Sequence, residues 1–275
     1  MDILVIGGGG REHAIVWKLN NRGHNIFCAP GNPGIADIAE CVSLHVNQMK
    51  ELADFAQSNK IDLTVVGPED PLTNGIVDQF EKRSLLIFGP NQESAHLEGS
   101  KAYAKKVMER FNVPTAAYME FDDFEEALAY VEEQGFPIVI KADGLAAGKG
   151  VTVAETIEEA ETALQAAMLH KIFGESGTKV VIEECLLGEE MTVLAFVDGK
   201  TVLPMVPSQD HKPVFDGDRG PNTGGMGAYS PVPHLEKWIP EIEKNILRPV
   251  AEGLRITGIG LDYATKFLRT VNLGL

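Results

Sequence analysis

Residues 137–151 form a glycine-rich stretch with two lysines, and these residue types in this order could bind phosphate groups. The apolar residues 137–140 predict a strand that ends at Lys141, and a loop that carries Lys149 follows it. Glycine lets backbone N–H groups approach an anion, and lysine adds positive charge. The loop glycines are Gly144, Gly148 and Gly150. We therefore expect a cradle for a triphosphate in this part of the chain.

The stretch differs from a P-loop. A P-loop needs a glycine five residues before its Gly-Lys pair and Ser or Thr directly after that pair. Asp143 and Gly150 occupy those two positions here. The alternative interpretation is a loose hairpin loop with a solvated lysine.

A second candidate site lies in residues 180–190, where an apolar run leads into an acidic segment with a glycine. The run predicts a buried strand, and the short crossover after it could contact an adenine through backbone amides and carbonyls. Glu190 follows Glu183 by seven residues, and its carboxylate could accept hydrogen bonds from the two ribose hydroxyls. The alternative is an acidic turn that is simply solvated.

A run of glycines at residues 7–10 precedes Arg11 and Glu12 and suggests an anion site near the amino terminus. It fails as a dinucleotide fingerprint because Glu12 replaces the last Gly or Ala, and because the second strand ends at residues 29–30 without an acid for a ribose. A phosphate held at the start of the next helix, with Arg11 as a donor, fits better. The remaining alternative is a tight turn that binds no ligand.

Short apolar runs alternate with amphipathic helical segments over the first hundred residues. Strands are predicted at residues 3–6, 25–29, 63–66 and 85–88, and helices at residues 11–21, 49–58 and 73–82. This alternation predicts an α/β fold with a parallel, doubly wound, Rossmann-like sheet that is covered on both faces. Ligands bind beyond the carboxyl ends of such strands. Glycine-containing loops fall at these ends, at residues 7–10, 30–34 and 67–72.

The pattern changes after residue 99. Ser100 is a predicted N-cap of a helix that runs to Arg110, with Lys101 and Lys105 one turn apart on one face. Acidic or amphipathic helices at residues 122–134 and 157–169 flank short strands at 151–154 and 179–184, which predicts a small α+β lid with the glycine loop at its edge. Strands at residues 191–197 and 201–205 predict a hairpin.

The composition of the chain limits the kinds of protein it could be. The chain has 275 residues, 44% of them hydrophobic and 23% charged, which is typical of a globular protein. A net charge of −16 argues against a nucleic-acid or membrane-surface partner. Three scattered cysteines indicate neither a disulfide framework nor a zinc site, and we expect small, partly buried thiols. With no signal segment and no long apolar run, we expect a cytoplasmic protein.

The order of these features is that of the ATP-grasp superfamily: a helix lysine, a strand lysine, a glycine loop, an acidic crossover and Glu190. Further motifs resemble the phosphoribosylamine–glycine ligase (glycinamide ribonucleotide synthetase) family. They lie at residues 8–13, 66–69, 142–150, 209–212 and 215–231. Together they cover residues 1 to about 258. The segment 217–233 could otherwise be an irregular surface loop, but a compact polar loop of this size is more often functional.

The resemblance implies a reaction and a set of residues. The family joins glycine to 5-phosphoribosylamine through glycyl phosphate in purine biosynthesis, using ATP and Mg²⁺ or Mn²⁺. The resemblance assigns nucleotide contacts to Lys101, Lys141, Gly144, Gly148, Lys149, Gly150, Glu183, Glu184, Leu186 and Glu190. It assigns substrate contacts to Gly9, Gly10, Arg11, Asn32, Pro68, Glu69, Asp210, Lys212, Thr223, Gly224, Gly225 and Met226. Catalytic roles fall to Lys141, Lys212 and Asp210.

The carboxyl-terminal part departs from the family. Residues 259–275 do not align with its motifs, and the segment that carries the metal-binding glutamate and asparagine is not found, so we expect a truncated chain with no metal ligands that fails to turn over. The predicted domains are a substrate-binding domain (1–99), a connecting helix and strand (100–122), a lid (123–188) and an incomplete core (189–258). We expect a monomer. The alternatives are another ATP-grasp ligase or carboxylase, or a non-catalytic nucleotide-binding fragment.

Overall fold

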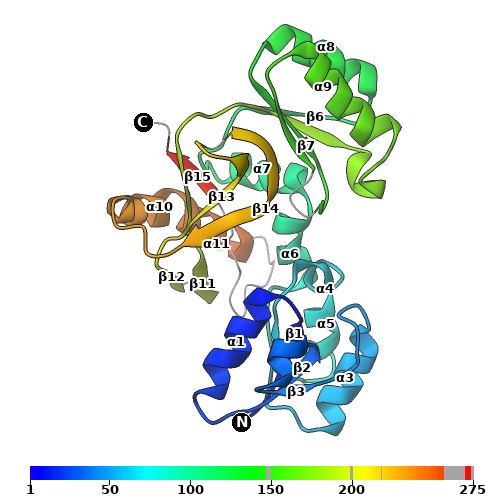
Figure 1. Cartoon of the computed structure of the whole chain (residues 1–275), viewed down its shortest axis with the longest axis vertical. Helices are drawn as coiled ribbons and strands as arrows, with labels where there is room; N and C mark the ends of the chain where they lie inside the picture. The colour runs from blue at the N-terminus through cyan, green and yellow to red at the C-terminus, as the bar shows by residue number, and fades with distance from the viewer. Residues whose placement is uncertain (147–149, 199–200, 218, 257–269, 274–275) are drawn as a thin grey trace. The chain divides into compact units, whose positions relative to one another are not determined.

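The computed structural model describes residues 1–146, 150–198, 201–217, 219–256 and 270–273 (Figure 1). The chain divides into two compact units. Met1–His96 belongs to the first unit, and Leu97–Phe196 with most of the later described residues belongs to the second.

The first unit is built on a five-stranded sheet with the order β3-β2-β1-β4-β5. Its strands are β1 (Asp2–Gly7), β2 (Asn25–Pro30), β3 (Glu40–Cys41), β4 (Leu63–Val66) and β5 (Ile87–Phe88). All four neighbouring pairs are parallel, which confirms the predicted parallel sheet. Its helices are α1 (Gly10–Asn20), α2 (Pro33–Ala36), α3 (Met49–Ser58), α4 (Glu69–Thr73) and α5 (Ile76–Glu81). The boundary between the two units falls within α6 (Gln92–Gly99).

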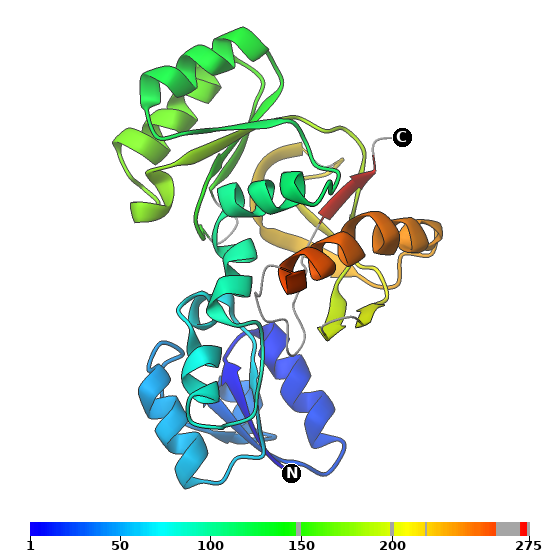
Figure 2. The same cartoon turned by 180° about the vertical axis from the view of Figure 1, so that it is seen from behind.

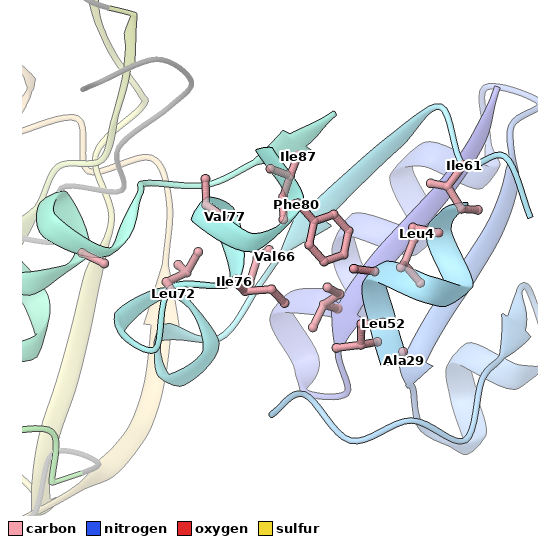
Figure 3. Packing of buried hydrophobic residues seen from close by; sticks show 14 residues of the cluster. Leu4, Ala29, Leu52, Ile61, Val66, Leu72, Ile76, Val77, Phe80 and Ile87 are labelled. Carbon is pink, nitrogen blue, oxygen red and sulfur yellow. The ribbon is translucent and has the colours of Figure 1, made fainter. Parts of the chain in front are cut away.

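Alternate residues of β1 pack into separate cores on the two faces of this sheet. Ile3 and Val5 belong to a cluster that includes Val16 of α1. Leu4 and Ile6 belong to a larger cluster on the opposite face, with side chains from α3 and α5. Figure 3 shows Leu52 and Phe80 of this second cluster packed along the sheet. Period-two alternation in a strand that is apolar throughout therefore produces the doubly wound arrangement.

The second unit contains a four-stranded antiparallel sheet with the order β6-β9-β7-β8. Its strands are β6 (Tyr118–Phe121), β7 (Ile138–Ala142), β8 (Val151–Ala154) and β9 (Val180–Glu184). Helices α8 (Phe124–Gln134) and α9 (Ile157–Leu164) pack together along one side of this sheet, as Figure 2 shows. Helix α7 (Lys101–Arg110) precedes β6 in the chain.

The rest of the second unit is made of short strand pairs and a helical segment. The paired strands are β10 (Glu189–Thr192) with β15 (Thr270–Leu273), β11 (Ala195–Asp198) with β12 (Thr201–Pro204), and β13 (Gln209–Phe215) with β14 (Arg219–Tyr229). Helices α10 (Ile239–Ile242) and α11 (Arg248–Ile256) are joined by a turn of π-helix, Glu243–Leu247. The β11–β12 pair confirms the predicted hairpin, whose turn residues 199–200 lie outside the described residues.

Several sequence predictions of secondary structure are wrong in detail. The helix predicted at residues 73–82 begins later, as α5, because Gly75 before it has φ 85°, and the separate helix α4 ends at Thr73. The strand predicted at residues 191–197 is interrupted, since β10 and β11 pair with different strands. The compact loop predicted at residues 217–233 consists largely of β14, which forms an irregular antiparallel ladder with β13. Helix α6 has no counterpart in the sequence prediction.

Candidate functional site

In the first unit, the loops after β1, β2 and β4 meet at the carboxyl edge of the parallel sheet. The N–H of Gly31 donates to the carbonyl of Gly7 at 3.1 Å. The Asn32 amide donates to the carbonyl of Gly8 at 3.0 Å, and its oxygen accepts from the N–H of Ile35 at 2.9 Å. Asn32 therefore caps α2 and fixes the glycine loop with the same side chain.

Glu12 is a buried carboxylate, 5% exposed, at the first turn of α1. Its Oε2 accepts a hydrogen bond from the N–H of Gly9 at 2.7 Å. A Cβ placed on Gly67 would lie 2.1 Å from its Oε1, so a larger residue there would force the Glu12 side chain to move. Glu12 thus accepts the hydrogen bond of one backbone N–H in the loop that was predicted to hold a phosphate. In the sequence, this residue served only as evidence against a dinucleotide site.

Arg11 reaches the loop after β4. Its Nη1 donates to the carbonyl oxygen of Gly67 at 2.8 Å and lies 3.4 Å from Oε2 of Glu69, with both side chains substantially exposed. Pro68 is the N-cap of α4, and Glu69 is the first residue of that helix. The structure therefore brings Gly9, Arg11, Asn32, Pro68 and Glu69 to one edge of the sheet, with Gly10 as the first residue of α1.

In the second unit, the start of α7 is held against the loop after β7. The Asp143 carboxylate accepts from the N–H of Ala102 at 2.7 Å and from the Ser100 hydroxyl at 3.1 Å. The Lys101 ammonium donates to the carbonyl oxygens of Gly144 at 2.9 Å and Asp143 at 3.3 Å. Ser100 also accepts from the N–H of Tyr103, which confirms the predicted N-cap.

The Lys101 side chain is partly buried. Burial lowers the pKa of its ammonium below the ordinary value of 10.5; the nearby carboxylate of Asp143 opposes this shift, and the positive charge of Lys141 adds to it. Burial disfavours the charged form of an amine, whereas an anion beside it favours that form. A bound anion in this place would therefore stabilise the ammonium of Lys101.

Lys141, near the end of β7, forms an ion pair with Glu183 of β9. The Lys141 Nζ lies 2.9 Å from Glu183 Oε2, and Lys105 of α7 places its own Nζ 3.0 Å from the same oxygen. The side chains of Lys105 and Glu183 are 5% and 8% exposed, and that of Lys141 is 26% exposed. Sequence reasoning placed Lys105 on the helix but gave it no role. Its position among the apolar residues of α7 is the signal that it is buried.

The crossover after β9 is anchored by backbone pairing. Glu184 Oε1 accepts from the N–H of Ala117 at 2.8 Å, and the Glu184 N–H donates to the carbonyl of Ala117 at 3.0 Å. The side chain of Leu186 is 41% exposed. Glu184 is thus engaged by the chain before β6, whereas Leu186 presents apolar surface.

A second polar cluster is formed by β10, β13 and β14. Lys212 Nζ lies 2.9 Å from Asp210 Oδ2 and 3.7 Å from Glu190 Oε2, and the Thr223 hydroxyl donates to the carbonyl of Lys212 at 2.8 Å. Thr223 also accepts from the N–H of Gly225 at 3.0 Å, while Gly224 and Met226 lie exposed beside it on β14. Buried Gln209 donates to the carbonyl of Glu190 at 2.8 Å and fixes its position.

Parts of the predicted phosphate loop show where its donors are used. The N–H of Gly144 donates to the carbonyl of Ser176 at 3.2 Å, and a Cβ on Gly144 would lie 2.4 Å from the Ser176 hydroxyl oxygen. Gly144 is therefore needed for close packing. The carbonyl of Gly150 accepts from the N–H of Ala142 at 2.8 Å. Gly148 and Lys149 lie outside the described residues.

Among the described residues, no group of three or more His, Cys, Asp or Glu side chains is arranged so that it could hold a metal ion. None of the helices in these same ranges combines the length and apolar character needed to cross a bilayer.

Comparison with known protein families gives matches over nearly the whole chain. The model of the phosphoribosylglycinamide synthetase N domain matches residues 1–98, and that of the ATP-grasp (A) domain matches residues 99–265. The second match extends beyond the limit of about residue 258 that the motifs predicted.

Curated relatives and a solved structure agree with these matches. The phosphoribosylamine–glycine ligase of Halalkalibacterium halodurans is 54% identical over 92% of this chain and 60% of its own length. That of Caldanaerobacter subterraneus is 50% identical over 98% of this chain and 66% of its own. The crystal structure of the Thermotoga maritima ligase, 32% identical, superposes with a TM-score of 0.80 over 99% of this chain and 66% of that one. The chain thus spans about three fifths to two thirds of these relatives.

More distant solved structures share the fold alone. Biotin carboxylase from Campylobacter jejuni is 17% identical, with a TM-score of 0.71 over 100% of this chain. The match of residues 99–265 to the family's ATP-grasp domain confirms the ATP-grasp architecture that was predicted from the order of lysines, glycine loop and acidic crossover.

Proposed function

Because the chain belongs to the phosphoribosylglycinamide synthetase family, we propose that it carries the nucleotide- and phosphoribosylamine-binding parts of a phosphoribosylamine–glycine ligase. The reaction joins the carboxylate of glycine to the amine of 5-phosphoribosylamine and consumes ATP, in the de novo synthesis of purines. Its products are glycinamide ribonucleotide, ADP and phosphate.

The chemistry requires the carboxylate to be activated first. An oxide would be a very poor leaving group, so a carboxylate oxygen of glycine attacks the γ-phosphorus of ATP and ADP departs. The amine of the sugar then attacks the carbonyl carbon of glycyl phosphate, inorganic phosphate leaves, and the nitrogen loses a proton. The protein's part is to position the reactants and to stabilise charge.

Roles for the second unit follow from its charges. Lys101 and Lys141 neutralise the phosphates of ATP, and Gly144, whose carbonyl accepts from Lys101, begins the glycine-rich loop next to that lysine. Glu183, Glu184 and Leu186 hold the adenine, and Glu190 accepts from the ribose. Lys212 and Asp210 form an ion pair, and we place the acyl transfer next to it. The Thr223 hydroxyl donates a hydrogen bond to the backbone carbonyl of Lys212. ATP is used together with Mg²⁺ or Mn²⁺, and we assign the ion no ligand among the described residues because none of their clusters fits it.

Roles for the first unit follow from its loops. Arg11 supplies a guanidinium for the phosphate of 5-phosphoribosylamine, and the start of α1 supplies a helix amino terminus. Asn32, Pro68 and Glu69 border the sugar. Since the N–H of Gly9 is taken by Glu12, the proposed donors are Arg11 and the backbone of Gly10.

The observation that supports the nucleotide site most strongly is the position of Lys141. Its ammonium is partly exposed at the end of β7, within 2.9 Å of a buried carboxylate, while Lys101 starts a neighbouring helix and has its charged form disfavoured by burial. Lys101 and Lys141 therefore carry positive charge that a bound anion would stabilise.

Calorimetric titration of the 275-residue chain with a non-hydrolysable ATP analogue tests the proposal. Lys141→Ala and Glu190→Ala should each weaken binding by roughly 1–3 kcal/mol, the value of a charge-assisted hydrogen bond. Lys106→Ala is a matched control, because this lysine pairs with Glu120 and its side chain is 61% exposed. Unchanged affinity in both site variants would refute the nucleotide site.

A further inference from the structure

One carboxylate oxygen in the second unit is shared by two ammonium groups. Glu183 Oε2 lies 3.0 Å from Lys105 Nζ and 2.9 Å from Lys141 Nζ. Glu183 is on β9, Lys105 on α7 and Lys141 on β7, so three separate elements contribute to this cluster. Two lysines and one glutamate give the cluster a net charge of +1.

Lys105 is held where it cannot reach a ligand in solution. The side chain is 5% exposed. Besides Glu183, its Nζ lies 2.8 Å from the Thr115 hydroxyl oxygen and 3.0 Å from the carbonyl oxygen of Ala116. An ammonium has three N–H donors, so these three oxygens suit a protonated lysine. The ring of Tyr118, with its centroid 5.1 Å from Nζ, adds a favourable cation–π contact.

Lys141 differs from Lys105 in its exposure. Its side chain is 26% exposed, whereas that of Glu183 is 8% exposed. If Lys141 were the only partner of Glu183, the two charges would cancel at 2.9 Å and leave little net field for an anion outside. Because the buried Lys105 also pairs with this oxygen, it balances the negative charge of Glu183, and one positive charge remains on the cluster.

We propose that Lys105 is a positioning residue for nucleotide binding, which compensates the charge of Glu183 so that the positive charge of Lys141 remains available to the phosphates. This inference rests on the proposed function, since it takes the ligand near Lys141 to be a nucleotide triphosphate. Lys105 acts through Glu183 and touches neither nucleotide nor substrate.

The competing explanation is that Lys105 only ties α7 to the sheet. Both explanations predict that loss of Lys105 reduces stability, because a buried ion pair loses a partner. They differ in which part of the nucleotide is affected. A packing defect weakens the binding of adenosine and ATP by the same factor, whereas a loss of net charge weakens ATP selectively.

The test measures the affinity ratio of ATP to adenosine in the full chain, by calorimetry and by competition, for four variants. Lys105→Met makes the cluster neutral, and the ratio should fall by about tenfold, the effect of roughly one charge-assisted contact. Lys105→Met/Glu183→Gln restores the net charge of +1, so its ratio should return to the wild-type value even if both affinities are lower. Glu183→Gln alone should give a ratio at or above wild type, and Lys105→Arg should keep the wild-type ratio.

Lys106→Met serves as the matched control, because it removes one lysine from the same helix but from an exposed pair with Glu120. Its ratio should not change. If Lys105→Met does not fold, the double variant and Lys105→Arg still decide the question. A double variant whose ratio stays well below wild type overturns the proposal, as does an equal loss of ATP and adenosine affinity in Lys105→Met. Failure of the wild-type chain to bind ATP would instead refute the proposed function.

Discussion

Lys101 donates a hydrogen bond from its ammonium to the carbonyl oxygen of Gly144 at 2.9 Å, so the first residue of α7 holds the beginning of the glycine-rich loop. The backbone of Lys101 contacts the same loop, since its N–H donates to the carbonyl of Asp143 at 3.0 Å. A triphosphate bound near Lys101 has to compete with these carbonyl oxygens for the same ammonium. If the nucleotide binds as proposed, its binding and the conformation of Asp143 and Gly144 are coupled through the side chain of Lys101.

This arrangement predicts a dependence of ATP affinity on alkaline pH. Burial lowers the pKa of Lys101 below 10.5 in the free protein, so its charge is lost at a lower pH than that of an exposed lysine. Phosphates favour the charged form, so ATP raises this pKa and binding takes up a proton. Affinity should fall as the pH rises through the pKa of Lys101 in the free protein. In Lys101→Arg the fall should be shallower, because a guanidinium stays charged.

Calorimetry in buffers of different ionisation enthalpy checks both parts, the pH profile and the proton uptake. Lys106→Arg is the control and should keep the wild-type profile, since this exposed lysine lies in a separate ion pair. The same profile in wild type and Lys101→Arg would contradict the prediction.

Asp143 should stabilise the second unit more than an ordinary capping residue does. Its carboxylate accepts from one backbone N–H of α7 and from the Ser100 hydroxyl. We expect Asp143→Ala to lower the free energy of unfolding by about 2 kcal/mol, and Asp123→Ala, which removes the exposed cap of α8, by about 1 kcal/mol. Urea denaturation followed by circular dichroism measures both. Equal losses would show that Asp143 acts only as a cap.

Local signals in the sequence predicted much of the fold. Apolar runs located the parallel strands β1, β2, β4 and β5 but not the short strand β3. The glycine loops after β1, β2 and β4 indicated the edge where side chains such as Arg11 and Asn32 meet. Ser100 was predicted as a cap from its own neighbours, and its hydroxyl accepts from Tyr103 at 3.1 Å. These features depend on residues close together in the chain, and they can therefore be predicted from the sequence.

Features that depend on distant residues were not predicted. The helical spacing placed Lys101 and Lys105 on one face but could not show that Glu183, on a strand almost eighty residues later, lies against Lys105. Glu12 was an argument against a dinucleotide, and only the folded sheet shows that its carboxylate holds Gly9 and lies against Gly67. Pairing of β13 with β14 likewise turned an expected loop into strands.

The two glycines that flank Gly9 should respond differently to alanine. A Cβ on Gly8 would lie 2.5 Å from the carbonyl oxygen of Gly31, which is backbone and cannot move easily, whereas a Cβ on Gly10 meets nothing within 4 Å. We expect Gly8→Ala to lower the free energy of unfolding by roughly 1–3 kcal/mol, the cost of overpacking. Gly10→Ala, in the first turn of α1, should be neutral or slightly stabilising because alanine favours a helix. Similar effects of both substitutions, measured by urea denaturation, would contradict the close approach of the two loops.

Cys28 and Cys41 should differ in their reactivity toward thiol reagents, although they are aligned on neighbouring strands β2 and β3. Cys28 is buried, and burial raises its pKa to about 12, with smaller contributions from Cys41 and Glu12. Cys41 is exposed, which corrects the expectation that all three thiols are partly buried. Because the thiolate is the nucleophile, iodoacetamide near neutral pH should modify Cys41 quickly and Cys28 only after the first unit unfolds.

Peptide mass spectrometry of samples quenched at increasing times assigns each modified cysteine. The variant Cys41→Ser is the control. Cys28 should remain protected from iodoacetamide in this variant, which would show that its protection does not depend on the thiol of Cys41. Adding urea past the unfolding transition should make Cys28 react as fast as a free thiol, because its pKa then returns toward the ordinary value and the side chain becomes accessible. Modification of Cys28 at the rate of Cys41 in the native protein would mean that β2 opens to solvent far more often than its buried position between β1 and β3 implies.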